Sequence, residues 1–104
     1  MDKQKRHESR ALKIHAFQES AAAQKNNQIF GLPFSVKESE LIIIPVPWEV
    51  TVSFRPGTAL GPEAIRDASY QVDLYNPMAP DAWKYGFAME GIDKRIQLQA
   101  QHLR

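Results

Sequence analysis

The sequence predicts an α/β protein built on a parallel sheet. The run Leu41–Ile44 is apolar at every position instead of alternating, which is typical of a strand that is covered on both faces. Its β-branched isoleucines pack well in a pleated sheet. A glycine-containing loop follows, and Gly61-Pro62 then marks a helix start, because proline suits the first helical turn. Strand, loop and helix in this order indicate an α/β unit.

The segment before the strand is mostly polar and predicts a helix. Ile14, Phe17 and Ala21 follow helical spacing, so we expect a helix near residues 8–25. The pair Asn26-Asn27 is expected to end it.

An irregular apolar segment over residues 30–34 is expected to pack on the body of the protein. No internal repeat or low-complexity tract is visible in the sequence. The predicted division is an N-terminal helical extension over residues 1–30 and a main unit over residues 31–104.

Prolines are expected to close the strand and to open the next helix. Pro45 and Pro47 end the strand pairing, because proline cannot donate a ladder hydrogen bond. Glu63 places a negative charge at the positive end of the helix dipole. We expect this helix to continue until residues 75–77 break it. The apolar face that it turns to the sheet is predicted to be Ile65, Ala68 and Val72.

The last quarter of the chain gives a mixed pattern. Residues 78–81 are rich in turn formers, and residues 83–89 fit either a short strand or an extended segment. A final helix is expected over residues 89–104. Its apolar face would hold Ile92, Ile96 and Leu103.

Composition excludes several classes of protein. Thirteen basic and twelve acidic residues leave a net charge of +1, which gives no electrostatic basis for binding nucleic acid or an anionic membrane. The absence of cysteine excludes disulfides and thiolate metal sites and fits a cytoplasmic location. The longest apolar run, residues 41–47, is much shorter than the roughly 20 residues of a transmembrane helix.

The most specific motif lies between residues 43 and 69. The strand ends in a proline, a Gly-Thr pair follows, and the helix begins Gly-Pro-x-x-Ile-Arg-x-Ala-Ser. This pattern resembles the N-terminal signature of the ureohydrolases, the arginase and agmatinase family, and residues 72–75 extend it weakly. The residues that carry the resemblance are Gly57, Thr58, Gly61, Pro62, Ile65, Arg66 and Ser69.

The resemblance implies a three-layer α/β/α fold around a parallel sheet, of which this chain would be the incomplete N-terminal portion. Family members hydrolyse guanidino or related C–N bonds at a two-manganese centre, whose ligand motifs follow later strands. The sequence holds no Gly-Gly-x-His, Asp-Ala-His-x-Asp or Asp-x-Asp motif. We therefore assign no catalytic and no metal-binding residue, expect no cofactor in this chain, and expect manganese only in a full-length member.

The resemblance favours one function and leaves two others open. The favoured reading is the N-terminal segment of an agmatinase-like ureohydrolase, inactive alone, whose complete form hydrolyses a guanidino compound to urea and an amine. The alternative is a short non-catalytic interaction protein that retains this surface. The third is a small anion- or nucleotide-binding module. Whether this chain itself is an enzyme stays open. Because a lone strand has open edges and faces, we expect self-association or docking to a full-length homologue.

Six residues of the loop and helix are candidate site residues: Arg55, Gly57, Thr58, Gly61, Pro62 and Arg66. Their expected roles are mainly structural, with the rim of an active site or an interface as the second reading. For Arg66 we favour a structural ion pair or loop hydrogen bond over a clamp on a substrate anion. For Arg55 we favour a solvated charge over a ligand contact.

Both glycines of the loop are expected to serve tight backbone geometry. The loop lacks the Lys-Ser/Thr of a P-loop and the glycine pattern of a dinucleotide fold, so a phosphate cradle is the weaker reading. We expect solvated side chains at His7, His15, Glu38 and Glu40. We expect an aromatic interface from Trp48, Phe54, Trp83, Tyr85 and Phe87.

Overall fold

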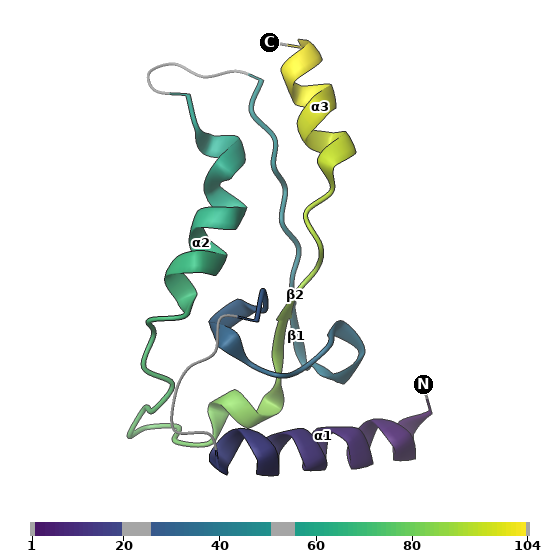
Figure 1. Cartoon of the computed structure of the whole chain (residues 1–104), viewed down its shortest axis with the longest axis vertical. Coiled ribbons are helices and arrows are strands. Elements are labelled where there is room, and N and C mark those ends of the chain that lie inside the picture. Colours follow the sequence, from purple (N-terminus) through teal and green to yellow (C-terminus); the bar gives the residue numbers. More distant parts are fainter. Residues whose placement is uncertain (1, 20–25, 51–55, 104) are drawn as a thin grey trace.

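The computed structural model describes residues 2–19, 26–50 and 56–103 (Figure 1). Its helices are α1 (Lys3–Glu19), α2 (Gly61–Ser69) and α3 (Lys94–Leu103), and its strands are β1 (Leu41–Ile43) and β2 (Phe87–Met89). Short 3-10 turns lie between them, at Ile29–Gly31, Val36–Glu38, Thr58–Leu60 and Ala82–Tyr85. In this described part, no helix is long and apolar enough to cross a membrane.

The two strands form a parallel pair, which confirms the predicted type of sheet. Leu41 lies opposite Phe87, and Ile43 lies opposite Met89. The chain passes from one strand to the other through α2, the kind of crossover that parallel strands require. Both strands run toward the end of the molecule that holds α3 (Figure 1). The result is a mixed helix-and-strand unit with a small parallel sheet.

The element boundaries refine the predictions. Helix α1 begins at Lys3 rather than near residue 8, because the Asp2 carboxylate accepts the Lys5 amide at 2.8 Å and caps the helix. Residues 20–25, where the helix was expected to end, lie outside the described residues. Helix α3 begins at Lys94 rather than at residue 89, since β2 occupies residues 87–89.

The core lies around the irregular segment before β1. Its most buried apolar side chains, each at most 2% exposed, are Ile29, Leu32, Phe34 and Ala88. Ala100 of α3 is equally buried but lies beside the glycine loop. Phe30 adopts a positive φ of 59°, and its ring meets Phe87 of β2 edge-on, with ring centres 6.0 Å apart. The predicted packing of this segment on the body is confirmed.

The sheet, in contrast, is open. Leu41 and Ile42 are 48% and 43% exposed, so the described residues do not cover β1 on both faces as expected. The predicted contact of the α2 apolar face with the sheet is also wrong here: Ile65 is 61% exposed, Ala68 is exposed, and Val72 lies beyond the helix. The radius of gyration is 16.4 Å, against about 13 Å for a compact domain of this length.

Helix α2 ends at Ser69, well before the expected break at residues 75–77. The Ser69 hydroxyl donates to the Arg66 carbonyl at 2.6 Å and accepts the Phe30 amide at 2.7 Å. A side chain that bonds to the backbone in this way competes with further helix. Ser69 therefore ends α2 and ties it to the turn at Ile29–Gly31.

Candidate functional site

The glycine loop is organised by a buried carboxylate. Glu49 is only 7% exposed, and one of its oxygens, Oε1, accepts the backbone amides of Gly57 and Thr58, the latter at 3.1 Å. A carboxylate that accepts backbone amides forms charge-assisted hydrogen bonds, the stronger kind. Glu49 therefore connects the chain that leaves β1 to the turn that opens α2.

The two glycines of the loop differ in their roles. Gly57 has a φ of 133°, which side chains rarely adopt, so glycine is required there for its backbone freedom. Gly61 has φ −54° and ψ −48°, ordinary helical values, and an added Cβ would meet nothing within 4 Å. The expectation of tight geometry is confirmed at Gly57 and wrong at Gly61.

The start of α2 follows the predicted pattern. Pro62 stands in the first turn, where its missing amide hydrogen removes no helical bond. Glu63 lies in the same turn and accepts a hydrogen bond from Lys94 of α3 at 2.9 Å, an interaction that lowers the pKa of Glu63. This exposed ion pair joins α2 to the beginning of α3.

The two candidate arginines remain without an assigned role. Arg55 lies outside the described residues. Arg66 is half-buried, and its Nε is a buried donor with no hydrogen-bond partner in the described ranges. Its carbonyl holds Ser69, as described above.

A cavity of about 310 Å³ lies between the glycine loop and α3. The loop side contributes Glu49, Gly57 and Leu60, and the α3 side contributes Gln97 and Gln101. Because the loop follows β1 and α3 follows β2, this cavity lies beyond the carboxyl ends of both parallel strands. Ligands of open α/β sheets bind at this end. The cavity is the candidate site of the chain.

The chemistry of the loop opposes an anion site. An incoming phosphate would need the loop amides, but the Gly57 and Thr58 amides already bind the Glu49 carboxylate. That carboxylate would also repel a second anion. The third hypothesis, an anion- or nucleotide-binding module, rested on free amides in the glycine loop, and the Gly57 and Thr58 amides are not free.

The described residues do not form a metal centre. Within residues 2–19, 26–50 and 56–103, no three histidine, aspartate or glutamate side chains converge. A dinuclear manganese centre requires several such donors. His7, His15 and His102 are exposed, as expected for the first two. This part of the chain does not fit the manganese centre that the resemblance implies for a complete protein.

Comparison with known sequences identifies the family. Residues 39–93, more than half of the chain, match the sequence model of the arginase family. The chain belongs to the arginase family. The matched range begins just before β1 and ends just before α3, so it contains both strands, the glycine loop and α2. The motif and the small parallel sheet are the arginase-family features of this chain.

Curated relatives match the same region. Over 43 residues the chain is 44% identical to an agmatinase of Bacillus anthracis and 42% identical to an agmatinase of Bacillus cereus. Over 42 residues it is 38% identical to an N(1)-aminopropylagmatine ureohydrolase of Synechocystis. Each match covers 40–41% of this chain but only 14–15% of the relative's length. No solved structure matches the chain.

The aromatic residues separate into two groups. Trp48 and Tyr85 are 40% and 64% exposed, as an interface would require. Trp83 and Phe87 instead pack within the chain: Trp83 lies against Phe17 and Phe34, with ring centres 4.9 and 6.5 Å away. Phe54 lies outside the described residues.

Glu49 and Glu38 have structural roles that the sequence analysis did not predict. Glu49 received no role there, and Glu38 was expected to be solvated, which is wrong, since it is 1% exposed. A signal for Glu38 was present: Ser35-x-x-Glu38 has the capping-box spacing, and the structure forms that box. Glu40 is exposed, as expected.

Proposed function

We propose that this chain is the N-terminal segment of an agmatinase-like ureohydrolase. The complete enzyme would hydrolyse a guanidino C–N bond and release urea and an amine. The family match and the agmatinase and ureohydrolase names of its relatives support this proposal. Substrate and manganese belong to the complete enzyme, and the cysteine-free composition is consistent with a cytoplasmic location.

The observation that carries the proposal is the position of the family motif in the fold. The loop and the start of α2, which hold the motif, lie beyond the carboxyl ends of two parallel strands, beside the cavity. At this position the loop would form part of the rim of an active site, while the reacting groups come from other segments. Gly57, Thr58, Gly61 and Pro62 shape that rim through the backbone.

The open sheet supports the same conclusion. The exposed side chains Leu41, Ile42 and Ile65 lie on a strand and a helix of types that are normally covered in an α/β protein. The chain spans about 15% of the length of the matched relatives, so further strands and helices are expected to supply that cover.

The first test is the intact mass of the native product. A mass several-fold above 11.8 kDa, together with manganese-dependent urea release by that product, supports the proposal. The matched control is the 104-residue chain expressed alone, which is expected to release no urea with manganese. A native product of 11.8 kDa without urea release from any guanidino compound would refute the enzymatic part.

One observation favours the non-catalytic alternative. After β1 the chain stays extended, and Ile44, Val46 and Trp48 point outward with 72%, 61% and 40% exposure, while Pro45 and Pro47 between them are buried. Such a row of apolar side chains is a docking surface for a second copy or for a full-length homologue. Co-purification of the native 11.8 kDa chain with a full-length homologue would favour this alternative.

A further inference from the structure

Helix α1 binds the rest of the chain through one polar face. The residues that make contact are Arg6, Ser9, Arg10 and Lys13, spaced i, i+3, i+4 and i+7, which places them on the same side of the helix. Among the apolar residues of α1, Leu12 is 74% exposed, whereas Phe17 packs against Trp83 with ring centres 4.9 Å apart. A helix in water is held mainly by the packing of its face, and here that face is basic.

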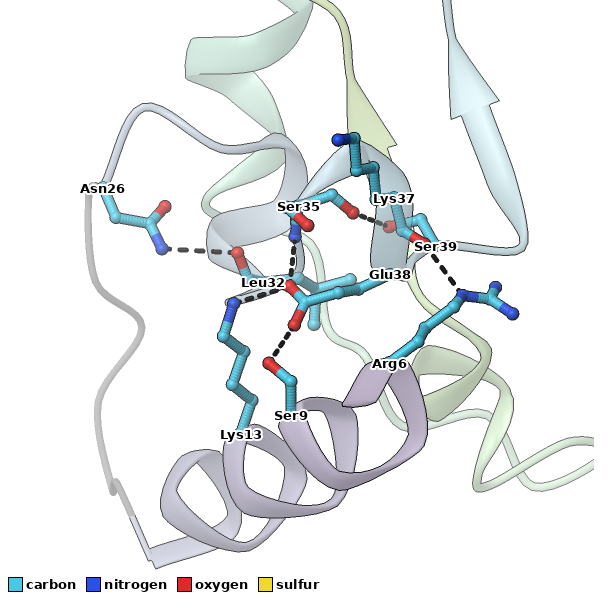
Figure 2. Close-up of polar contacts among 9 residues, drawn as sticks. All are labelled: Arg6, Ser9, Lys13, Asn26, Leu32, Ser35, Lys37, Glu38 and Ser39. Atoms are coloured by element: carbon cyan, nitrogen blue, oxygen red, sulfur yellow. Dashed lines mark hydrogen bonds and ion pairs between the residues drawn. The ribbon is translucent and has the colours of Figure 1, made fainter. Parts of the chain in front are cut away.

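The carboxylate of Glu38 binds the middle of this basic face. The Lys13 ammonium lies 2.5 Å from its Oε1, the Ser9 hydroxyl donates to its Oε2, and the Ser35 amide donates to Oε1 at 2.9 Å (Figure 2). Arg6 donates to the Lys37 carbonyl at 2.8 Å from the preceding turn of α1 (Figure 2). The basic face therefore closes on the turn that leads into β1.

Arg10 joins the starts of both strands. One of its nitrogens donates to the Lys84 carbonyl at 2.7 Å and to the Tyr85 carbonyl at 3.1 Å, directly before β2. Another lies 3.6 Å from the Glu40 carboxylate, directly before β1. A guanidinium presents several donors in a fixed plane, so one side chain spans both sites. Its own side chain is 14% exposed.

Two features favour reversible binding of α1. The Arg10 Nε is buried without a hydrogen-bond partner in the described part of the chain, which weakens the docked form because water would satisfy this donor after release. The body also has its own anchor: Asn26 donates to the carbonyls of Gly31 and Leu32, both at 3.3 Å. This anchor holds the backbone at Gly31 and Leu32 through contacts that do not involve α1.

We propose that α1 is an electrostatic latch: it binds the starts of β1 and β2 through its basic face, covers Trp83 with Phe17, and leaves as a unit while residues 26–50 and 56–103 keep their fold. Release exposes an aromatic and acidic surface that comprises Trp83 and Glu38. Since α1 precedes the family-matched range, this inference goes beyond the proposed function and does not depend on it.

The test is hydrogen exchange of the 104-residue chain at increasing salt. Between low salt and 1 M NaCl the screening length falls from about 10 Å or more to about 3 Å, which weakens ion pairs that reach solvent. We expect amide exchange in α1 to accelerate about tenfold, the combined effect of three such pairs, with little change in α2. A Trp48→Phe variant leaves Trp83 as the single tryptophan, and its fluorescence should shift to the red in parallel.

Variants at the latch distinguish release from global unfolding. Lys13→Gln and Arg10→Gln are expected to accelerate exchange in α1 about tenfold or more at low salt. The first removes the cation beside the buried Glu38 carboxylate, and the second removes the donors to the Lys84 and Tyr85 carbonyls. The matched control is Lys94→Gln, which removes a Lys–Glu pair of 2.9 Å far from α1 and should leave α1 exchange unchanged. Equal acceleration in α1 and α2, no response to salt, or an α1 that exchanges freely at low salt would each overturn the latch.

Discussion

Replacement of Glu38 by glutamine is the most informative single perturbation of this chain. The side chain keeps its shape, but its charge is lost at a site that is 1% exposed. Three donors then face a neutral group: the Lys13 ammonium, the Ser9 hydroxyl and the Ser35 amide. The glutamine NH₂ also replaces one acceptor oxygen by a donor, which fits the Oε2 position, because the Ser9 hydroxyl there can accept instead of donate.

The magnitude follows from the three hydrogen bonds. A hydrogen bond to a charged group contributes about 1.5–3 kcal/mol, and a neutral one about 0.5–1.5 kcal/mol. A difference of about 1 kcal/mol for each of three bonds gives a loss of about 3 kcal/mol. Small domains have a free energy of unfolding of only about 5–15 kcal/mol, so this loss is large.

The same carboxylate gives the chain a specific dependence on pH. Burial alone raises the pKa of Glu38, but hydrogen bonds from Lys13, Ser9 and Ser35 outweigh burial and lower the pKa to about 2, from an ordinary value of 4.5. A lowered pKa means that the unfolded chain binds the proton more readily. The stabilisation is therefore complete above pH 4.5 and is lost as the pH falls toward 2.

The assay is urea denaturation followed by circular dichroism, from pH 6 down to pH 2, at one protein concentration and one oligomeric state. Wild type is expected to lose more stability than Glu38→Gln over this range, so that the two converge at low pH. The control is Glu40→Gln, an exposed carboxylate in ion pairs of 3.5 and 3.6 Å with Arg6 and Arg10, which should change stability by less than about 1 kcal/mol. Parallel pH profiles for wild type and Glu38→Gln would refute the reasoning.

Three further predictions concern the glycine loop and the exposed row. Gly57→Ala should destabilise the chain by about 1–3 kcal/mol because of its φ of 133°, whereas Gly61→Ala, at an ordinary helical φ, should change the urea midpoint little; equal effects would contradict the distinction. Val46→Glu should reduce self-association measured by sedimentation velocity, since it places a charge in the middle of the exposed apolar row; an unchanged sedimentation profile would remove that surface as the interface. Phosphate and nucleotides should not raise the melting temperature of wild type, because Glu49 occupies the loop amides, and a clear rise would restore the anion-binding reading.

Local signals in the sequence were sufficient for β1 and for the start of α2, whereas residues 83–89, which contain β2, fitted either a strand or an extended segment. The apolar run at Leu41–Ile44 predicted a strand, and Gly61-Pro62 predicted a helix start, because both depend on residues that are adjacent in the chain. The parallel pairing was also predicted, through the absence of alternation in the strand. The family motif then located the loop and α2 correctly.

Features that depend on distant partners were not predictable in the same way. Glu38 was expected to be a solvated charge before a strand. It is buried instead, and its partners Lys13 and Ser9 lie 25 and 29 residues earlier in the chain. Glu49 was missed because its partners, the Gly57 and Thr58 amides, are backbone groups that carry no sequence signal. The contact of Ile65 with the sheet was wrong because the described sheet has only two short strands.

The prolines that alternate with the exposed apolar row have a consequence for aggregation. The extended segment after β1 exposes Ile44, Val46 and Trp48. An exposed apolar segment of this kind could pair with other chains and stack into fibrils. Pro45 and Pro47 provide no amide hydrogen, so an added strand finds no ladder donors at two of the first four positions beyond Ile43. The two prolines therefore oppose the growth of a fibril by strand addition, while the exposed apolar side chains can still contact another protein.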